Sequence, residues 1–200
     1  MDLPAADTRS RILDAAAALL RRHGPDKLTV LDVAKRLGMS HGNVYRHFPS
    51  KQALRAAVAE EWLSGVTAPL AAIAAGNAPP PARLREWLAA LAAIKRRKVL
   101  EDPEMFAGFH RVASESPEVI AAHLAALVAQ VARILAEGRG DGTLPAVTDP
   151  EADARAVLSA TMRFHHPDLV AGSGEERAAT EELARITALL LRGLGAAAAT

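Results

Sequence analysis

Apolar residues recur at helical spacing along almost the whole chain, and no segment alternates apolar and polar residues convincingly as a half-buried strand would. In the first segment, Ile12, Ala16 and Leu19 fall on one helix face and are followed by the stop signal Gly24-Pro25. Ala, Leu, Arg and Glu, which are good helix formers, dominate the composition. The pattern predicts an all-α fold of about nine helices.

Caps and breakers set the expected limits of these helices. A polar cap precedes a first-turn proline at Asp102-Pro103, Ser116-Pro117 and Asp149-Pro150. Pro69 is expected to kink a long helix, and residues 77–81 form a breaker after it. We expect helices at about 8–23, 30–37, 41–47, 50–75, from the breaker to the basic run 95–98, and at 102–114, 116–137, 149–162 and 174–194.

Two short helices joined by a tight turn form the most informative segment. Thr29, with Asp32 three residues later, is an acidic variant of a capping box that opens the first of them. Gly38 is expected to end that helix, and Ser40 to cap the second, which runs from His41 to about 47. This arrangement predicts a helix-turn-helix.

Charge and composition narrow the function classes. The chain has 200 residues, a formal net charge of +1 and no cysteine, which excludes disulfides, thiolate metal sites and a cysteine nucleophile. Residues 1–50 hold 8 Lys and Arg against 5 Asp and Glu, so the first quarter is weakly basic. Uninterrupted apolar runs such as 88–94 are too short to span a bilayer, and no signal peptide is visible, so we expect a cytoplasmic protein without a membrane partner.

The segment from Thr29 to Leu54 resembles the helix-turn-helix of the tetracycline-repressor (TetR) family of bacterial transcription regulators. The resemblance rests on residues that occur in the order usual for that family: Thr29, Ala34, Gly38, Ser40, Gly42, Tyr45, Phe48, Lys51 and Leu54. It covers about residues 8–58, whereas the rest of the chain matches only in helix count and layout. The resemblance implies a DNA-binding domain at 1–52 and a helical effector-binding and dimerisation domain at 53–200.

A helix fits the major groove of DNA, and its N-terminal residues can reach base edges. The residues expected on the base side are His41, Gly42 and Arg46, although Arg46 could equally hold a phosphate. Polar residues at the helix starts and on the outward side are expected at the DNA backbone, where the family usually holds it: Thr29, Ser40, Asn43, Tyr45, His47 and Lys51. Tyr45 could instead pack by its ring, and His47 could cap the helix.

One DNA-binding domain of this size buries too little surface for tight specific binding. We therefore expect the protein to bind double-stranded DNA as a homodimer on a palindromic operator. The expected seam is a four-helix bundle that uses the apolar residues of the last two helices, as the resemblance also suggests. These residues are Ala156, Val157, Ala160, Leu183, Ile186, Leu190 and Leu194. The alternative is that the same faces pack only within one chain.

The TetR resemblance also implies control by a small, largely apolar effector. Large side chains of the C-terminal part are the candidates for lining its pocket, with plain core packing as the alternative: Trp62, Trp87, Met105, Phe106, Phe109, His110 and Phe164. His165 and His166 are adjacent, so they point about 100° apart on a helix and cannot readily share a metal ion. We expect them to stabilise a helix C-terminus by imidazole charge, and we expect no metal or cofactor.

Enzyme signatures are weak in this sequence. Gly138, Gly140 and Gly142 follow a helix without a preceding strand, so they indicate a helix end and a loop rather than a phosphate-binding loop. We therefore expect that the protein is not an enzyme. We expect a repressor that a ligand releases from its operator. The alternatives are an effector-independent DNA-binding activator or architectural protein, or a helical-bundle enzyme.

Overall fold

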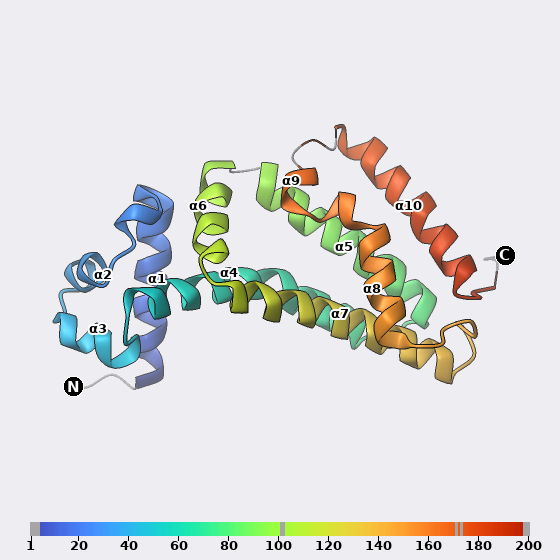
Figure 1. Ribbon diagram of the computed structural model, residues 1–200, viewed down its shortest axis with the longest axis horizontal. Helices are drawn as coiled ribbons and strands as arrows, with labels where there is room; N and C mark the ends of the chain where they lie inside the picture. Colours follow the sequence, from blue (N-terminus) through green and yellow to red (C-terminus); the bar gives the residue numbers. More distant parts are fainter. Residues whose placement is uncertain (1–4, 101–102, 171, 173, 198–200) are drawn as a thin grey trace. The chain divides into compact units, whose positions relative to one another are not determined.

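A computed structural model describes residues 5–100, 103–170, 172 and 174–197 of the chain. Every regular element in these ranges is helical, and no strand occurs in them, which confirms the all-α prediction (Figure 1). Asp102, expected as a helix cap, lies outside the described residues.

The described part of the chain forms ten α-helices and two short 3-10 helices, one α-helix more than expected. In chain order they are α1 (Ala5–His23), η1 (Pro25–Lys27), α2 (Val30–Leu37), α3 (His41–His47), α4 (Lys51–Ala74), α5 (Pro80–Leu100), α6 (Pro103–Ser114), α7 (Pro117–Gly140), α8 (Pro150–Ala160), η2 (Met162–Phe164), α9 (Pro167–Val170) and α10 (Glu176–Gly193). The additional helix is α9, a single turn within a segment that carries no apolar period long enough to predict it.

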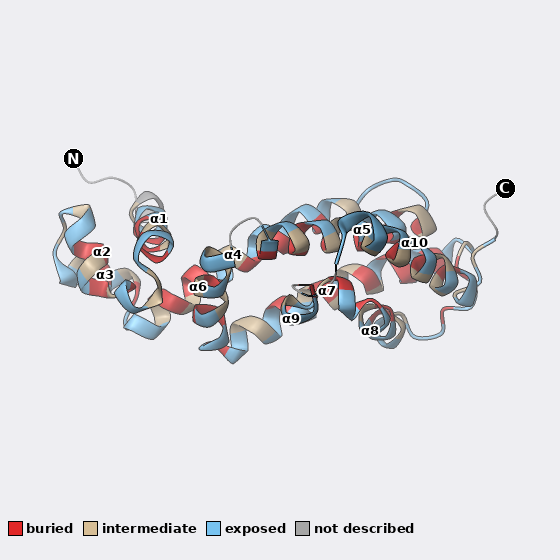
Figure 2. Cartoon of the chain, turned by 90° about the horizontal axis from the view of Figure 1, so that it is seen from above, coloured by how far each residue is buried: buried red, intermediate tan, exposed pale blue. Residues whose placement is uncertain are grey.

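The helices pack into two compact units. The head unit comprises the described residues up to Ser64 together with 103–123, and the body unit comprises 65–100 and the described residues from Leu124 onwards. Figure 2 shows buried residues concentrated on the inward sides of the helices in each unit. The head unit therefore combines α6, a distant segment of the chain, with α1 to α3.

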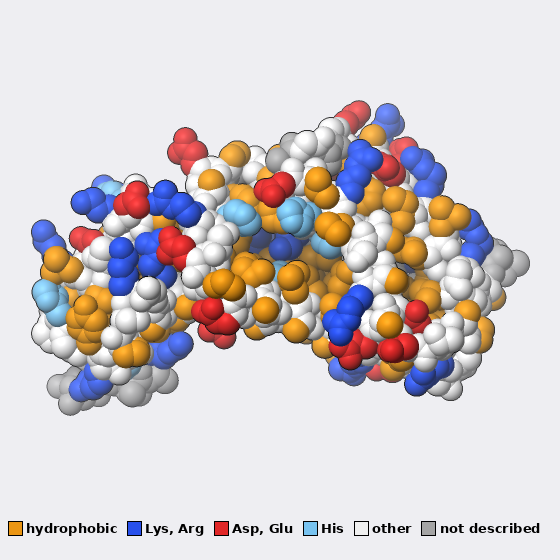
Figure 3. Space-filling view, viewed as in Figure 1, with side chains coloured by type: hydrophobic (Ala, Val, Ile, Leu, Met, Phe, Trp, Pro, Cys, Tyr) orange, Lys and Arg blue, Asp and Glu red, His pale blue; other side chains and the backbone are white. Residues whose placement is uncertain are grey.

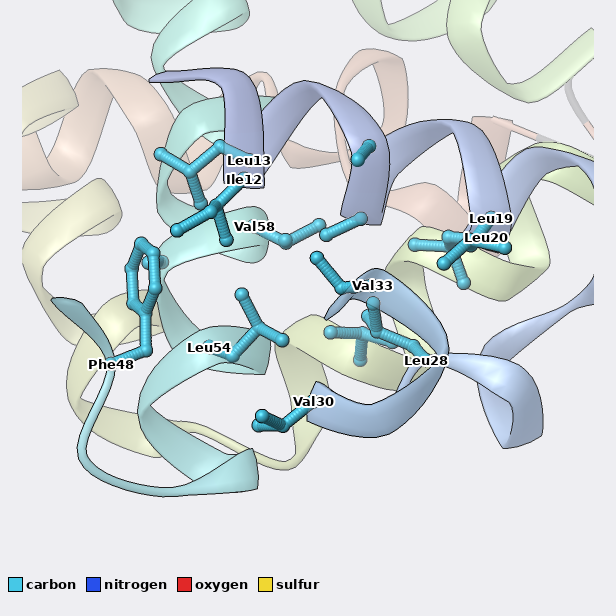
Figure 4. Close-up of a cluster of buried hydrophobic side chains, with 14 of the residues drawn as sticks. Ile12, Leu13, Leu19, Leu20, Leu28, Val30, Val33, Phe48, Leu54 and Val58 are labelled. Atoms are coloured by element: carbon cyan, nitrogen blue, oxygen red, sulfur yellow. The ribbon is translucent and has the colours of Figure 1, made fainter. Parts of the chain in front are cut away.

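The core of the head unit is formed mainly by aliphatic side chains (Figure 4). Ile12 from α1, Val33 from α2 and Leu54 from α4 are fully buried in it, and Phe48 closes it after α3. Phe109 of α6 belongs to the same cluster. Each such side chain contributes about 1.5–3 kcal/mol by leaving water. This core fixes the relative orientation of α2 and α3.

The body unit has a separate core around Trp87 of α5, which is fully buried. The Trp87 Nε1 donates a hydrogen bond to the Gln130 Oε1 at 2.9 Å, and the Gln130 Nε2 donates to the Thr67 carbonyl at 3.0 Å. The indole is thus buried with its polar group satisfied, which is the condition for burying tryptophan without a penalty.

The limits of several helices differ from those expected. The first helix begins at Ala5 instead of residue 8, and α7 continues to Gly140 instead of ending near 137. Gly138 is buried within α7, where an added Cβ would lie 2.6 Å from the Leu144 Cδ1. A glycine inside the helix is therefore required by the close approach of the following loop, and Gly142, with a φ of 77°, lies in that loop.

The expectation that imidazole charge acts at His165 is wrong. Burial lowers the pKa of His165 to about 4, so the ring is neutral at pH 7. Its Nε2 lies 3.1 Å from the Leu158 carbonyl near the end of α8. The ring therefore does contact a helix C-terminus, but as a neutral hydrogen-bond donor.

Among the described helices, α7 alone is long and apolar enough to cross a membrane by length and composition. Its Leu127, Val131 and Ile134 are buried in the body core. Arg133 and Glu137 form an ion pair one helical turn apart on its exposed side, at 3.0 Å. The helix thus packs one side against the body core, whereas Leu124 on it keeps 55% of its surface exposed.

Candidate nucleic-acid interface

Two side-chain caps build the helix-turn-helix. The Thr29 Oγ1 accepts a hydrogen bond from the Asp32 N at 3.1 Å and donates one to the Asp32 carboxylate at 2.6 Å. The Ser40 Oγ accepts one from the Asn43 N at 3.3 Å. Both predicted caps are confirmed, and each satisfies one of the free N–H groups in the first turn of its helix.

The turn between α2 and α3 depends on Gly38. Its φ of 64° and ψ of 30° place it in the left-handed region, where a side chain would be strained. The N–H of the next residue, Met39, donates to the Ala34 carbonyl at 3.0 Å, which completes the C-terminal cap of α2. The turn is therefore fixed by local backbone geometry that the sequence predicted.

The base-side candidates lie on the open side of α3. His41, Gly42 and Arg46 are exposed, whereas Val44 on the opposite side is fully buried in the head core. The Arg46 Nη2 donates to the Asn43 Oδ1 at 2.9 Å, which holds the guanidinium along the exposed surface. Gly42 leaves space above the first turn, since only the Ser40 Oγ, at 4.0 Å, lies within reach of an added Cβ.

The backbone-contact candidates are less uniform. Ser40, Tyr45 and Lys51 are exposed, and Tyr45 keeps 49% of its surface accessible, so its ring is not a core residue. Thr29 and Asn43 are half-buried, and both side chains already make hydrogen bonds within the head. Their contacts with DNA stay predictions. Figure 3 shows several Lys and Arg side chains on the visible face of the head unit.

His47 has an unusual environment at the end of α3. It is half-buried, and its Nε2 is enclosed without a hydrogen-bond partner among the described residues. A buried polar atom without a partner costs free energy. The contact of His47 with the DNA backbone stays a prediction, because its Nε2 is enclosed within the head unit.

Sequence reasoning missed two arginines that support this surface. The Arg9 guanidinium lies 5.1 Å from the centre of the Phe48 ring, and Arg55 is buried beneath the head. The Arg55 Nη1 donates to the Pro25 carbonyl at 2.7 Å, and its Nη2 lies 2.6 Å from the Glu115 carboxylate. Arg55 follows Leu54 on the inward side of its helix, and a charged residue at an apolar position was the available signal.

The effector candidates do not form one cluster. In the head unit, the Trp62 ring lies 5.4 Å from Phe109 and 5.6 Å from Phe106, and Phe106 stacks on His110 at 5.6 Å. Met105 packs against the same core. The other two candidates, Trp87 and Phe164, belong to the body unit, where Trp87 is core. Phe164 lines a cavity between α5 and α10.

The residues expected at a dimer seam divide by exposure. Ala156 and Ala160 are exposed on α8, whereas Val157 is buried in the body core. On α10, Leu183 is buried, and Ile186 and Leu190 are half-buried, as is Leu194 directly after the helix. Leu189, which was not among the candidates, keeps 59% of its surface accessible. Among the described residues, no three His, Asp or Glu side chains are placed to hold a metal ion.

Comparisons with known proteins place both parts of the chain. The family model for bacterial regulatory proteins of the tetR family matches residues 12–58, and that for the tetracyclin repressor-like C-terminal domain matches residues 80–186. An HTH-type transcriptional repressor of Mycobacterium tuberculosis is 41% identical over 56 residues, which is 28% of this chain and 30% of the relative. The match spans less than a third of the length of the curated relatives.

Solved structures cover nearly the whole chain. A TetR-family regulator from Mesorhizobium loti has a TM-score of 0.69 at 18% identity, with 96% of this chain and 97% of that one covered. A structure described as the molecular basis for control of antibiotic production by bacterial hormones has a TM-score of 0.62 at 29% identity, with coverage of 94% and 98%. With a head and a body that both match, this chain belongs to the TetR family of bacterial transcriptional regulators.

Proposed function

We propose that this DNA-binding regulator is a repressor that binds a palindromic operator as a homodimer and is released by a small-molecule effector. Residues 1–52 would bind DNA, and residues 53–200 would bind the effector and form the dimer. The observation that carries the DNA-binding part is the exposed side of α3, where His41, Gly42 and Arg46 project from a rigidly packed head.

Two copies are needed because one α3 reads only one half-site. A dimer would place its two recognition helices about 34 Å apart, in successive major grooves. The exposed apolar residues of α8 and α10, including Ala160 and Leu189, support a seam on these helices. Burying such a face against a second copy would remove apolar surface from water.

Two comparisons support repression and ligand control. The M. tuberculosis relative is a repressor, and the structure at 29% identity is described in terms of control by bacterial hormones. An effector that binds more tightly to the conformation that does not fit the operator would shift the protein towards that conformation. Operator affinity would then fall in proportion to the effector's preference for it. An effector-independent regulator would have the same head but no such ligand. We infer a cytoplasmic location, where the operator is accessible.

The test uses the full chain and the DNA upstream of its own gene, labelled for fluorescence anisotropy. Tyr45→Ala and Lys51→Ala are expected to weaken binding to operator and unrelated DNA alike, and Lys51→Ala to reduce the salt slope by about one unit per half-site. His41→Ala or Arg46→Ala is expected to change preference at one or two base positions, at about 1–3 kcal/mol each.

Arg177→Gln is a matched control because it removes a positive charge from the exposed surface of α10 in the body. We expect it to leave both affinity and salt slope unchanged. Equal losses for the control and the α3 variants would contradict the assignment of the interface. Uniform loss across all operator variants for Arg46→Ala would move Arg46 from the bases to the phosphates.

A further inference from the structure

A cavity of about 390 Å³ lies within the body unit and is lined by residues of α5 and α10. Figure 1 shows where these two helices run. Three alanines of α5, Ala89, Ala92 and Ala93, form the middle of one wall. Their spacing places them on one face of the helix. Because alanine side chains are short, this wall cannot fill the gap between the two helices. The volume lies in the range of pockets that hold small molecules.

The opposite wall is one face of α10 and is also mostly apolar. Ala179, Leu183 and Ala184 line it, and Phe164 of η2 and Val170 of α9 add larger side chains. Leu183 and Phe164 are themselves almost fully buried, so both already pack within one chain. The cavity therefore has the apolar body that a hydrocarbon chain requires.

The two ends of the cavity differ in charge. At one end, Arg96 and Glu176 both line the cavity, and the Arg96 Nη2 donates to the Gly174 carbonyl at 2.7 Å. At the other end, Arg85 lies eleven residues earlier on α5, about 16 Å along the helix. The structure gives Arg85 no ion-pair or hydrogen-bond partner among the described residues. One end thus carries a positive and a negative side chain, and the other end carries a positive side chain alone.

Thr187 supplies a polar group to the wall of the cavity. It lines the cavity with only 4% of its surface exposed, and its hydroxyl has no hydrogen-bond partner among the described residues. Arg96, near the end of α5, bonds to Gly174 just before α10, so the two helices run in opposite directions along the cavity. Thr187, in the second half of α10, therefore lies at the same end of the cavity as Arg85. The hydroxyl is accessible from the cavity, so a ligand with an acceptor group could accept a hydrogen bond from it.

We propose that this cavity binds a medium-chain carboxylic acid as its anion. The carboxylate would accept hydrogen bonds from the Arg85 guanidinium, in the paired geometry that suits both groups, and from the Thr187 hydroxyl. The hydrocarbon chain would lie along the alanine wall towards Arg96. The inference rests on the proposed function in one respect: a ligand bound here is expected to lower operator affinity.

The experiment measures binding of decanoate to the full-length protein by isothermal titration calorimetry, below the micelle concentration. We expect one decanoate per chain, and at least tenfold weaker binding of decanol, which lacks the charge. Arg85→Gln is expected to weaken decanoate at least tenfold without affecting decanol. Thr187→Val, which keeps the shape, is expected to weaken decanoate severalfold. Arg97→Gln on the exposed side of α5 is the matched control and is expected to change nothing.

Ala92→Leu places extra carbons in the cavity and is expected to prevent binding of both compounds while thermal unfolding and dimer mass stay unchanged. Unchanged decanoate affinity in Arg85→Gln and Ala92→Leu, or no binding by the wild type at millimolar concentration, would overturn the proposal. A shift of Ala92→Leu to monomers in sedimentation would also overturn it, since the second copy would then occupy the groove.

Operator binding in the presence of decanoate separates this inference from the proposed function. Binding with the expected pattern but without loss of operator affinity supports the site and contradicts ligand-released repression by it. Release of the operator by another compound, in a protein that does not bind decanoate, supports the proposed function and overturns this site.

Discussion

The head and the body build their candidate sites in opposite ways. In the head, the candidate residues of α3 lie on an exposed helix surface within seven consecutive positions, held from behind by buried Val44 and Phe48. In the body, the cavity is concave, and its walls come from α5 and α10, about ninety residues apart in the chain. DNA is a large partner that meets a convex helix, whereas a small molecule needs a surface that encloses it.

The same contrast holds for charge. The α3 candidates His41, Tyr45 and Arg46 keep their polar groups in water until a partner displaces it. The body instead buries Lys95 and most of His165, and burial is the main cause that lowers the pKa of each, to about 8 and about 4. The head therefore carries its chemistry on the surface, and the body carries part of it inside.

The largest expected effect tests whether the two cores are independent. Phe48→Ala in the head and Trp87→Ala in the body are each expected to lower the free energy of unfolding by about 3–5 kcal/mol, because each leaves a cavity in a packed core. Hydrogen exchange read by mass spectrometry is expected to show lost protection in α2 and α3 for the first variant and in α5 and α7 for the second. Equal losses in both units for either variant would show one cooperative core.

A second test concerns the buried lysine. The pKa of Lys95 falls from 10.5 to about 8 on folding, so the unfolded chain binds more protons between these values, and stability rises with pH across that window. The rise is on the order of 3 kcal/mol. Lys95→Met is expected to be more stable than the wild type at pH 7 and to lose this rise in urea unfolding.

Lys27→Met serves as its control, because Lys27 is exposed in the head unit. We expect its stability to follow the wild-type pH curve. A variant at position 95 that kept the rise between pH 8 and 10.5 would show that another group causes it.

Smaller effects are expected from the helix caps, which work alike in the two units. Thr29→Ala at α2 and Asp149→Ala at α8, whose carboxylate accepts from two backbone N–H groups, are each expected to cost about 1 kcal/mol of unfolding free energy. Only Thr29→Ala is expected to weaken operator binding in an anisotropy titration. A matching loss for Asp149→Ala would link the cap of α8 to the DNA site.

The smallest effects are expected from exposed ion pairs. Arg111→Gln in the head breaks a 2.7 Å pair with Asp26, and Arg155→Gln in the body breaks a pair with Glu151. All four side chains are more than half exposed, so each change is expected to alter the free energy of unfolding by less than about 0.5 kcal/mol in urea unfolding. A larger loss in one unit would show that its surface pairs are coupled to the core.

The sequence predicted the head because its signals are local. The Thr29 and Ser40 caps and the left-handed Gly38 each act within four residues, so their spacing alone defines the two helices and the turn. Arg55 was missed because its partners, Pro25 and Glu115, lie 30 and 60 residues away.

The body could be predicted only as a set of helices. The cavity depends on how α5 packs against α10, and periodicity does not determine which helix faces which. Large side chains were expected to line a pocket or to fill the core. Trp87 lies in the core, and Phe164 lines the cavity together with five alanines. Small residues leave space where they pair across an interface, a property that no single helix reveals.

The packing of α6 with α1 sets a limit on how this protein could be recombined. A chimera that exchanged the first 52 residues for those of another regulator would keep Phe109 and Val112, which are buried in the head core, opposite a foreign surface. It would also keep the ion pair of Glu115 with Arg55, but Arg55 would lose the Pro25 carbonyl of the original head, to which it donates a hydrogen bond. The transferable piece is therefore discontinuous in sequence, and a working graft would have to carry α6 along with the N-terminal segment.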